Sequence, residues 1–367
     1  MLAWLDHLPT DPTLRLASLI ALGLAATTVL VMVQVLVISS IADRERRQRA
    51  LFNREWRPRL ARASLDPSML RSRLPLRGTR SLWWLMLWNR IQRQLRGESV
   101  GRLNRVLVDS GMREHALRLL RRRGVRRRLV ALETLRHLAD PIHGRQVEPL
   151  VRGRNPYVAL AAAAALVAMA PQRAMQQLIP LFLQRPDWGR QRMVALCRAA
   201  GADAVTPALL EALAQGTPEQ VSRLIPLLPC ADAQRVAPWA RACVANDADP
   251  RDRLAAVRAL DAVRDPRDRE LFISASQDPD PGVRLAAVEA LSRQARADDV
   301  AMLAALLSDR SWWVRRRAAD TLAALPQLEP AALQHLLGTV EDRYGREALA
   351  RAIEERATET GTLAMTS

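Results

Sequence analysis

The longest apolar stretch of the chain lies near its N-terminus, where residues 16–42 carry no charged side chain. As an α-helix, these 27 residues would extend about 40 Å, which exceeds the roughly 30 Å hydrocarbon core of a bilayer. A cleaved signal peptide would begin with basic residues and have a shorter apolar run, whereas here only Arg15 precedes the run and an Arg cluster follows it. The pattern therefore predicts one uncleaved transmembrane helix over residues 16–42, after a short segment of residues 1–15.

A different pattern fills the C-terminal two thirds of the chain, where short apolar segments recur at a nearly constant interval. Each segment has an aliphatic residue at a matching place, and the residue before it is Ala or Thr in seven of the eight copies. Successive aliphatic positions are separated by 31, 30, 32, 32, 31, 31 and 31 residues, and they are Leu135, Leu166, Leu196, Leu228, Leu260, Leu291, Leu322 and Ile353. This interval accommodates two short helices and two turns, and the small residue lets neighbouring helices approach closely.

Composition agrees with a helical repeat array, because aromatic residues make up only 4% of the chain and strand-forming residues are sparse beyond the first forty positions. A second apolar helix is expected between the repeated positions, as in residues 298–309, and turns such as residues 277–282 separate the helices. The sequence thus predicts an all-α fold, an α-α superhelix of about seven or eight antiparallel helix pairs over residues 98–357, with a flexible tail at residues 358–367. We expect five of the repeated residues to be buried: Leu135, Leu166, Leu260, Leu291 and Leu322.

Two segments, DPDPGVRLAAVEAL and DRSWWVRRRAADTL, share a turn, a Val-Arg pair, small residues and a final aliphatic residue. They resemble the bacterial HEAT-like repeats first named from phycobilisome lyases. The resemblance covers about residues 120–357, although residues 188–196 and 220–228 lack the Val-Arg pair. It implies a solenoid that serves as a binding scaffold and does not by itself imply an activity.

Between the apolar run and the repeats, residues 43–80 combine Arg with three Pro, which predicts a short amphipathic start and then an irregular basic linker. Residues 81–97 follow as an amphipathic helix with Trp on one side and Arg on another. One interpretation places this helix in a membrane interface, with six residues contacting lipid: Trp83, Trp84, Trp88, Arg90, Arg93 and Arg96. The alternative is that the Trp side chains cap the open apolar end of the first repeat.

The net charge of +17 comes entirely from Arg, since the sequence has 55 basic residues and no Lys. Residues 44–136 contain 26 Arg and seven acidic residues, whereas residues 137–367 contain 28 of each. The excess charge lies beside the apolar run, on its C-terminal side. By the positive-inside rule this predicts a single-pass protein of the bacterial inner membrane, with the N-terminus periplasmic, the C-terminal domain cytoplasmic, and anionic lipid headgroups as contacts.

The sequence contains none of the short motifs that signal nucleotide binding, a nucleophilic serine or a zinc protease. It also has no His-Glu dipeptide, the pair that binds iron in deoxyhypusine hydroxylase, a HEAT-like enzyme. His137 and His143 flank a turn without a third ligand nearby, and the three Cys lack CxxC spacing and fit core positions. We therefore expect a protein that is not an enzyme and that carries no metal and no cofactor.

The remaining candidate is SWWVRRR, residues 311–317, where two Trp precede three Arg at the start of a repeat helix. Exposed Trp and Arg are typical of interaction hot spots, while the same pattern in a repeat could serve core packing and turn hydrogen bonds. The residues that we expect to mark a partner-binding surface are Trp312, Trp313, Arg315, Arg316, Arg317, Arg253, Arg284 and Glu289.

These observations favour a non-catalytic, membrane-tethered scaffold or adaptor that binds a protein partner at the cytoplasmic face of the inner membrane. By analogy it would be an accessory subunit of an exopolysaccharide glycosyltransferase or a secretion complex. The alternative is a nucleic-acid-binding HEAT-like protein, because Arg-rich surfaces bind phosphate. The location of the charge beside the apolar run, rather than along the repeats, weighs against nucleic acid.

Overall fold

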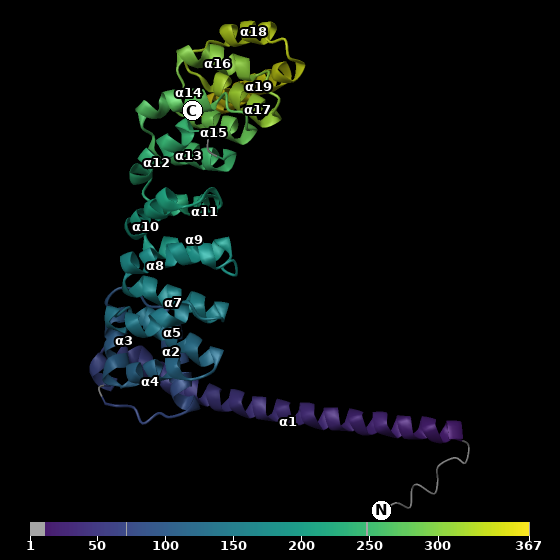
Figure 1. Ribbon diagram of the computed structural model, residues 1–367, viewed down its shortest axis with the longest axis vertical. Coiled ribbons are helices and arrows are strands. Elements are labelled where there is room, and N and C mark those ends of the chain that lie inside the picture. Colours follow the sequence, from purple (N-terminus) through teal and green to yellow (C-terminus); the bar gives the residue numbers. More distant parts are fainter. Residues whose placement is uncertain (1–11, 71, 247–248, 367) are drawn as a thin grey trace, which may run out of the picture. The chain divides into compact units, whose positions relative to one another are not determined.

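The computed structural model describes residues 12–70, 72–246 and 249–366, with the backbone alone at residues 12–15, 17–19 and 359–366. Within these ranges the chain forms helices and no strand, which confirms the predicted all-α fold (Figure 1). It divides into two compact units, Met1–Leu138 and Ala139–Ser367, here named the N-terminal unit and the repeat unit.

The N-terminal unit is a small bundle at the end of one long helix. Its elements are α1 (Pro12–Ala63), η2 (Pro67–Leu70), α2 (Thr79–Gln92), α3 (Glu98–Asp109), α4 (Met112–Arg121) and α5 (Val125–Leu138). Helix α2 packs against α1, α4 and α5, and α3 packs against α4 and η2. The C-terminal part of α1 belongs to this bundle, whereas its apolar N-terminal part extends away from it (Figure 1).

Helix α1 continues without interruption to Ala63, so the amphipathic start expected within residues 43–80 is longer than predicted and is continuous with the apolar helix. The reason is a stripe of buried residues among the Arg residues: Phe52, Trp56 and Leu60 are each at most 8% exposed. The Phe52 ring meets Trp83 of α2 edge-on at a centroid distance of 5.8 Å. Pro58 is tolerated inside the helix because it lies on the solvent-exposed side, where water can satisfy the carbonyl that loses its partner.

The helices of the repeat unit that the 31-residue interval predicts lie in two layers (Figure 1). One layer carries the repeated aliphatic residues: α7 (Pro156–Met169), α9 (Arg190–Ala200), η4 (Ile225–Cys230), α13 (Pro250–Val263), α15 (Pro281–Ser292), α17 (Trp312–Ala324) and α19 (Arg343–Thr366). The other layer consists of α6 (Gly144–Val151), α8 (Pro171–Gln184), α10 (Ala202–Gln215), α12 (Ala233–Ala245), α14 (Arg269–Ala275), α16 (Val300–Leu306) and α18 (Pro330–Thr339). Short connecting helices are η3 (Pro141–His143), α11 (Pro218–Leu224), η5 (Pro266–Asp268) and η6 (Ala297–Asp299).

The core of the repeat unit runs between these two layers. Four of the five residues expected to be buried lie in this core and are at most 8% exposed: Leu166, Leu260, Leu291 and Leu322. The fifth, Leu135, is buried in α5 of the N-terminal unit. Several of the helices begin with Pro at the first helical position, preceded by an Asp that caps the helix. The Asp280 carboxylate, for example, accepts hydrogen bonds from the amides of Gly282 and Val283. These caps satisfy backbone donors that have no partner inside a helix, which explains the DP turns of the sequence.

The least regular copy is the one at residues 218–230. Pro226 and Pro229 lack an amide hydrogen, so this layer position holds the seven-residue α11 and the 3-10 helix η4 instead of one α-helix. Leu228 is still buried at 6% exposure. The shortened element leaves an apolar hollow of about 500 Å³ that Leu228, Val236 and Leu254 help to line.

The last residues of the chain, for which a flexible tail at 358–367 is predicted, continue α19. The backbone of α19 remains helical to Thr366, and Ser367 lies outside the described residues.

Candidate functional site

Two Arg side chains that the sequence assigned to a partner-binding surface are instead engaged within the repeat unit. Arg253 donates to Asp278 through Nε and Nη2, at 2.7 and 2.9 Å. One repeat further on, Arg284 donates to Asp309 through the same two nitrogens, both at 2.8 Å. Each Arg belongs to one repeat and each Asp to the turn before the next, so these pairs, here named the Arg–Asp ladder, join consecutive repeats.

The ladder is structural because its members are withdrawn from solvent. The side chains of Arg253 and Asp278 are 11% and 9% exposed, and those of Arg284 and Asp309 are 14% and 8% exposed. Burial alone would raise the pKa of Asp309, but hydrogen bonds from Arg284 and the Ser311 amide outweigh it and hold the pKa below its ordinary value. Asp278 has a lowered pKa for the same combination of causes, with Arg253 and the Asp280 amide as donors.

We expect this ladder to make the repeat unit sensitive to acid. A carboxylate with a lowered folded pKa stabilises the fold fully above its ordinary pKa of 3.8, and loses that contribution as the pH falls through the folded value. The melting temperature, followed by circular dichroism, should therefore decline steeply below about pH 4.

The control is Asp309→Asn, which cannot lose a charge at that position. This variant should melt at a lower temperature than the parent chain at pH 7, and the difference between the two should narrow as the pH falls. Parallel melting curves from pH 7 to pH 3 would contradict a stabilising role for the pair.

The two Trp of residues 311–317 remain on the surface, as the partner-binding interpretation requires. Trp312 and Trp313 are 49% and 62% exposed, and their rings meet edge-on with centroids 4.5 Å apart. The next residue, Val314, is fully buried and occupies the core position of the repeat. The two exposed indole rings place apolar surface in water, which is unfavourable unless another molecule covers it. They are therefore the strongest candidate for contact with a partner.

Two of the Arg residues that follow this Trp pair in the sequence form ion pairs within the chain. Arg316 pairs with Asp320 at 3.0 Å and with Glu355 of α19 at 2.5 Å. Arg317 pairs with Glu289 of α15 at 3.4 Å, which also accounts for the expected contact residue Glu289. These pairs hold α17 against its neighbours and are exposed enough to contribute little energy each.

The structure separates the Trp and Arg side chains of residues 81–97 into two environments. Trp83, Trp84 and Trp88 are at most 5% exposed in the core of the N-terminal unit. Trp88 Nε1 donates to the Leu103 carbonyl at 3.1 Å, and Asn89 bonds to α5 through the Val130 carbonyl. This burial favours the capping interpretation, because α5 carries the first repeated position, and it removes these indoles from any lipid contact.

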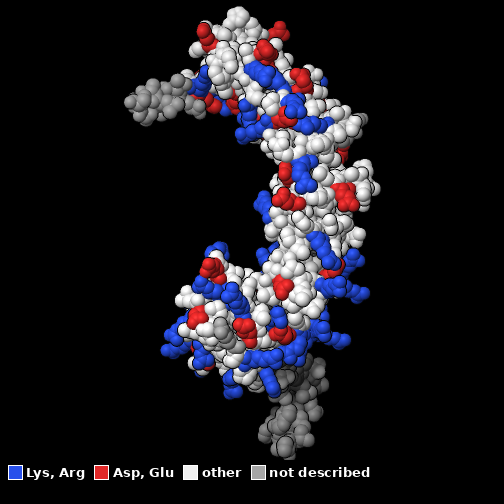
Figure 2. Space-filling model, turned by 90° about the vertical axis from the view of Figure 1, so that its left-hand side faces the viewer, with Lys and Arg blue, Asp and Glu red and all other residues white. Residues whose placement is uncertain are grey.

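The basic residues of the same segment stay on the surface: Arg90, Arg93 and Arg96 are all exposed. Figure 2 shows basic side chains crowded over the N-terminal unit, while in the repeat unit acidic side chains are more evenly mixed with basic ones. The sequence-derived charge asymmetry is therefore present on the surface.

The apolar part of α1 is not packed against the rest of the described chain. Residues 20–63 include one stretch with a mean hydropathy of 2.4 that is 0% buried, long and apolar enough to cross a membrane. Such a helix is also compatible with a signal sequence, and its side chains, for example Leu24 at 69% and Leu30 at 67% exposure, need a cover other than water.

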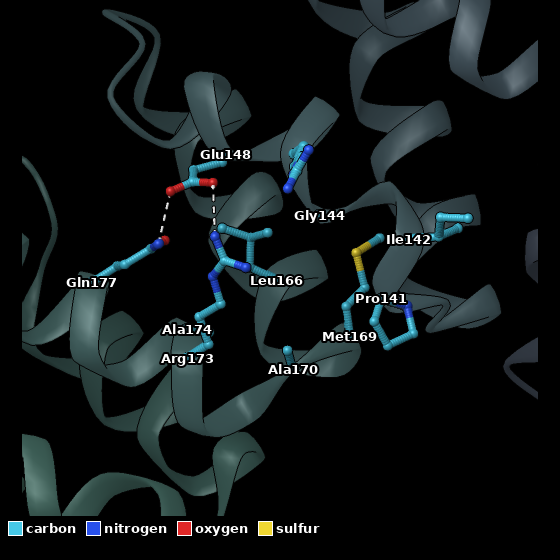
Figure 3. A pocket seen from close by; sticks show the side chains of 11 residues that line it. Pro141, Ile142, Gly144, Glu148, Leu166, Met169, Ala170, Arg173, Ala174 and Gln177 are labelled. Atoms are coloured by element: carbon cyan, nitrogen blue, oxygen red, sulfur yellow. Dashed lines mark hydrogen bonds and ion pairs between the residues drawn. The ribbon is translucent and has the colours of Figure 1, made fainter.

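A second hollow lies between α6, α7 and α8 and has a volume of about 310 Å³ (Figure 3). One of its polar groups is Glu148, which accepts a hydrogen bond from Gln177 at 2.7 Å and pairs with Arg173 at 3.8 Å. The opposite wall is apolar, with Leu166 and Met169.

The titratable residues considered for metal or redox chemistry have other surroundings. His137 meets the Trp88 ring edge-on, and His143 lies 3.9 Å from Asp140. Burial raises the pKa of the Cys197 thiol to about 12 and that of Cys243 to about 11, so both stay protonated and unreactive. Within the described ranges no three His, Cys, Asp or Glu residues gather as metal ligands would.

Comparisons with known proteins bear on the repeats. Residues 237–303 and 270–355 match the family of HEAT repeats. Two solved structures are similar: YibA of Escherichia coli (13% identity, covering 74% of this chain and 91% of that chain, TM-score 0.33) and an engineered protein (16% identity, covering 74% and 88%, TM-score 0.35). No curated protein matches the chain. Residues 237–355 thus match HEAT repeats, and the chain as a whole has an all-α, HEAT-like repeat fold.

Proposed function

We propose that this chain is a non-catalytic scaffold, anchored in a bacterial inner membrane by α1, whose HEAT-like repeats bind a protein partner at the cytoplasmic face. The observation that carries the proposal is the continuity of α1. One uninterrupted helix joins an exposed apolar stretch to a folded, strongly basic unit. HEAT repeats generally serve as protein-interaction scaffolds, and such repeats offer extended surfaces for this purpose.

The membrane part of the proposal rests on surface energetics. The side chains from Ile20 to Ile41 are exposed, most of them aliphatic, and burying them in hydrocarbon would recover about 25 cal/mol per Å². Arg44, Arg46 and Arg47 follow at once and are exposed. Their position supports an orientation with the repeats in the cytoplasm, and residues 1–15 in the periplasm.

The basic N-terminal unit would then lie next to the cytoplasmic leaflet. Exposed Arg residues near an anionic surface contribute about 1 kcal/mol each. Arg90, Arg93 and Arg96 are exposed and would face headgroups, with Arg93 also paired to Glu133 at 3.5 Å, whereas the Trp side chains of α2 are buried. Lipid contact would therefore orient this unit electrostatically, and α1 alone would provide retention.

The repeats would hold the partner through the exposed Trp312 and Trp313 rather than through the buried ladder. A scaffold tethered beside the bilayer meets membrane proteins at a high effective concentration. We propose in particular an accessory subunit of an inner-membrane assembly, of the kind formed by exopolysaccharide glycosyltransferases or secretion complexes.

Membrane fractionation with reporter fusions tests this function. We expect the chain to remain in the membrane pellet through an alkaline carbonate wash, because α1 is held by hydrocarbon contact and not by charge. A reporter after Ser367 should be active in the cytoplasm and one before Met1 in the periplasm. Release by carbonate, or the reverse reporter pattern, would refute the anchor or its orientation.

A helix exchange separates the scaffold from a partner that is recognised within the bilayer. Replacing residues 16–42 by an unrelated transmembrane helix should preserve co-purification of the partner, while Trp312→Ala with Trp313→Ala should abolish it. Loss of the partner on helix exchange alone would place recognition in the membrane. Salt-dependent retention of DNA by the detergent-solubilised chain would instead favour the nucleic-acid-binding alternative.

A further inference from the structure

The Arg–Asp ladder stops at its third position, and this interruption lies beside the exposed Trp pair. Arg253, Arg284 and Arg315 are 31 residues apart in the sequence, and Asp278 and Asp309 follow the same interval. The next position of the Asp series is Val340. Arg315 thus has no carboxylate where the two preceding Arg residues have one.

The hydrogen bonds of Arg315 show what is missing. Its Nη1 donates to the carbonyls of Asp309 and Arg310, at 2.6 and 3.3 Å, just as Arg284 Nη1 donates to the turn before α15. In the two preceding ladder positions the Arg Nε donates a hydrogen bond to an Asp carboxylate. The Nε atom of Arg315 is buried and has no hydrogen-bond partner in the described chain. A guanidinium edge shaped to hold a carboxylate is therefore left without one.

One exposed aromatic side chain lies over this Arg, and two more exposed aromatic residues begin the helix that carries it. The Tyr344 ring lies over the Arg315 guanidinium, 5.4 Å from its carbon, and is 60% exposed. The backbone of α19 comes close to Leu307 beside Tyr344: a side chain at Gly345 would come within 2.3 Å of the Leu307 carbonyl oxygen. Trp313 occupies the matching position of the preceding repeat, with Trp312 beside it.

We propose that Arg315, Trp312, Trp313 and Tyr344 form the docking site for an acidic segment of the protein partner. In this site an Asp or Glu of the partner takes the place that Asp278 and Asp309 occupy in the preceding repeats, and the neighbouring apolar residue of the partner packs on the two Trp rings. The Tyr344 ring swings aside to admit the carboxylate to Nε, a motion open to an exposed side chain. The inference rests on the proposed scaffold function and specifies its surface.

The observation that favours an acidic partner is charge complementarity. The unpaired donor edge belongs to a permanent cation, and an exposed Arg310 lies beside it. Trp, Tyr and Arg are the residues that contribute most binding energy in protein interfaces. Here the rings would exclude water from an ion pair between Arg315 and a carboxylate of the partner. A basic or purely apolar segment would leave the guanidinium edge unsatisfied.

The test supplies the missing carboxylate from within the chain. In Val340→Asp, the new side chain should occupy the Arg315 edge as Asp309 occupies that of Arg284, and so compete with the partner. Val340→Asn is the matched control, because it has the same size and removes the same valine without adding a charge. Both variants are compared as full-length chains in lipid nanodiscs.

The probes are two immobilised, capped peptides, Gly-Ser-Leu-Asp-Leu-Ser-Gly and its Asn counterpart. We expect the parent chain and Val340→Asn to bind the Asp peptide at least about tenfold more tightly than the Asn peptide, and Val340→Asp to lose this preference. Trp312→Ala with Trp313→Ala should weaken binding of the Asp peptide without changing the melting temperature by more than a few degrees, since both rings are exposed.

Equal binding of the two peptides by the parent chain would overturn the carboxylate site, and so would equal binding of the Asp peptide by Val340→Asp and Val340→Asn. Neither result bears on the scaffold itself. A membrane partner that co-purifies equally with both Val340 variants overturns the site and leaves the scaffold standing, whereas failure to recover a partner with the parent chain overturns the scaffold.

Discussion

Replacing Trp84 by Ala should destabilise the N-terminal unit by about 3–5 kcal/mol, the cost of removing a fully buried large aromatic side chain. Trp84 is 0% exposed and lies in α2, which packs against α1, α4 and α5, so the cavity would open at the centre of the unit. Such a loss is a large part of the stability of a small bundle. Hydrogen exchange of the α2 amides, measured on the detergent-solubilised chain, should show the destabilisation directly.

The matched control for this experiment is Trp312→Ala, an equal truncation at a side chain that is 49% exposed. It should change stability by less than about 0.5 kcal/mol, as surface substitutions usually do. If Trp84→Ala left exchange unchanged and instead weakened binding to anionic vesicles, the membrane-interface interpretation of residues 81–97 would be right after all. The two outcomes are opposite because a side chain cannot be both buried in protein and inserted in lipid.

Replacing Leu291 by Ala should cost the repeat unit about 2–5 kcal/mol. Leu291 is 1% exposed and belongs to a core cluster with Val257, Leu260 and Phe272, which come from α13 and α14. The truncation removes contacts to the preceding repeat as well as within its own. Because each repeat is stabilised mainly by its neighbours, the effect should extend to the adjacent helices.

Thermal unfolding followed by circular dichroism measures this loss, and protection of α13 and α17 amides reports its spread. Ile142→Ala is the control, since Ile142 is an aliphatic residue of the same unit that is 74% exposed. Equal melting temperatures for the two variants would contradict the placement of Leu291 in the core. A loss confined to α15 would contradict coupling between repeats.

The period of the repeats could be predicted because the same short pattern of small and aliphatic residues recurs along the chain. Each copy must bury one face against its neighbours, so a buried aliphatic residue and a small residue recur at the same place. The prediction weakened where proline replaced the pattern, at residues 218–230, because backbone donors are lost there and the element shortens. The helical extent of residues 43–63 was missed for a related reason: its apolar stripe is sparse and interrupted by Arg.

The candidate surface was predicted only in part. Trp312 and Trp313 could be chosen from composition, and they are exposed. Arg253 and Arg284 were chosen by the same reasoning, yet they lie in ion pairs, because an Arg on a repeat helix looks alike in sequence whether a carboxylate of the next turn reaches it or not. The 31-residue spacing of Asp278 and Asp309 is the signal that could have revealed the pairs, and Val340 the signal for their interruption.

By itself, the sequence determined the all-α class, the repeat interval and the separation of an apolar run from a basic segment, since these follow from periodicity and charge along the chain. Only the tertiary structure decided which polar side chains are used internally. The Trp side chains of α2 are buried, and Arg253 and Arg284 are paired with Asp residues. The Nε atom of Arg315 has no hydrogen-bond partner in the described chain. The physical reason is that burial and pairing depend on residues 25 to 45 positions away, which meet only when helices pack.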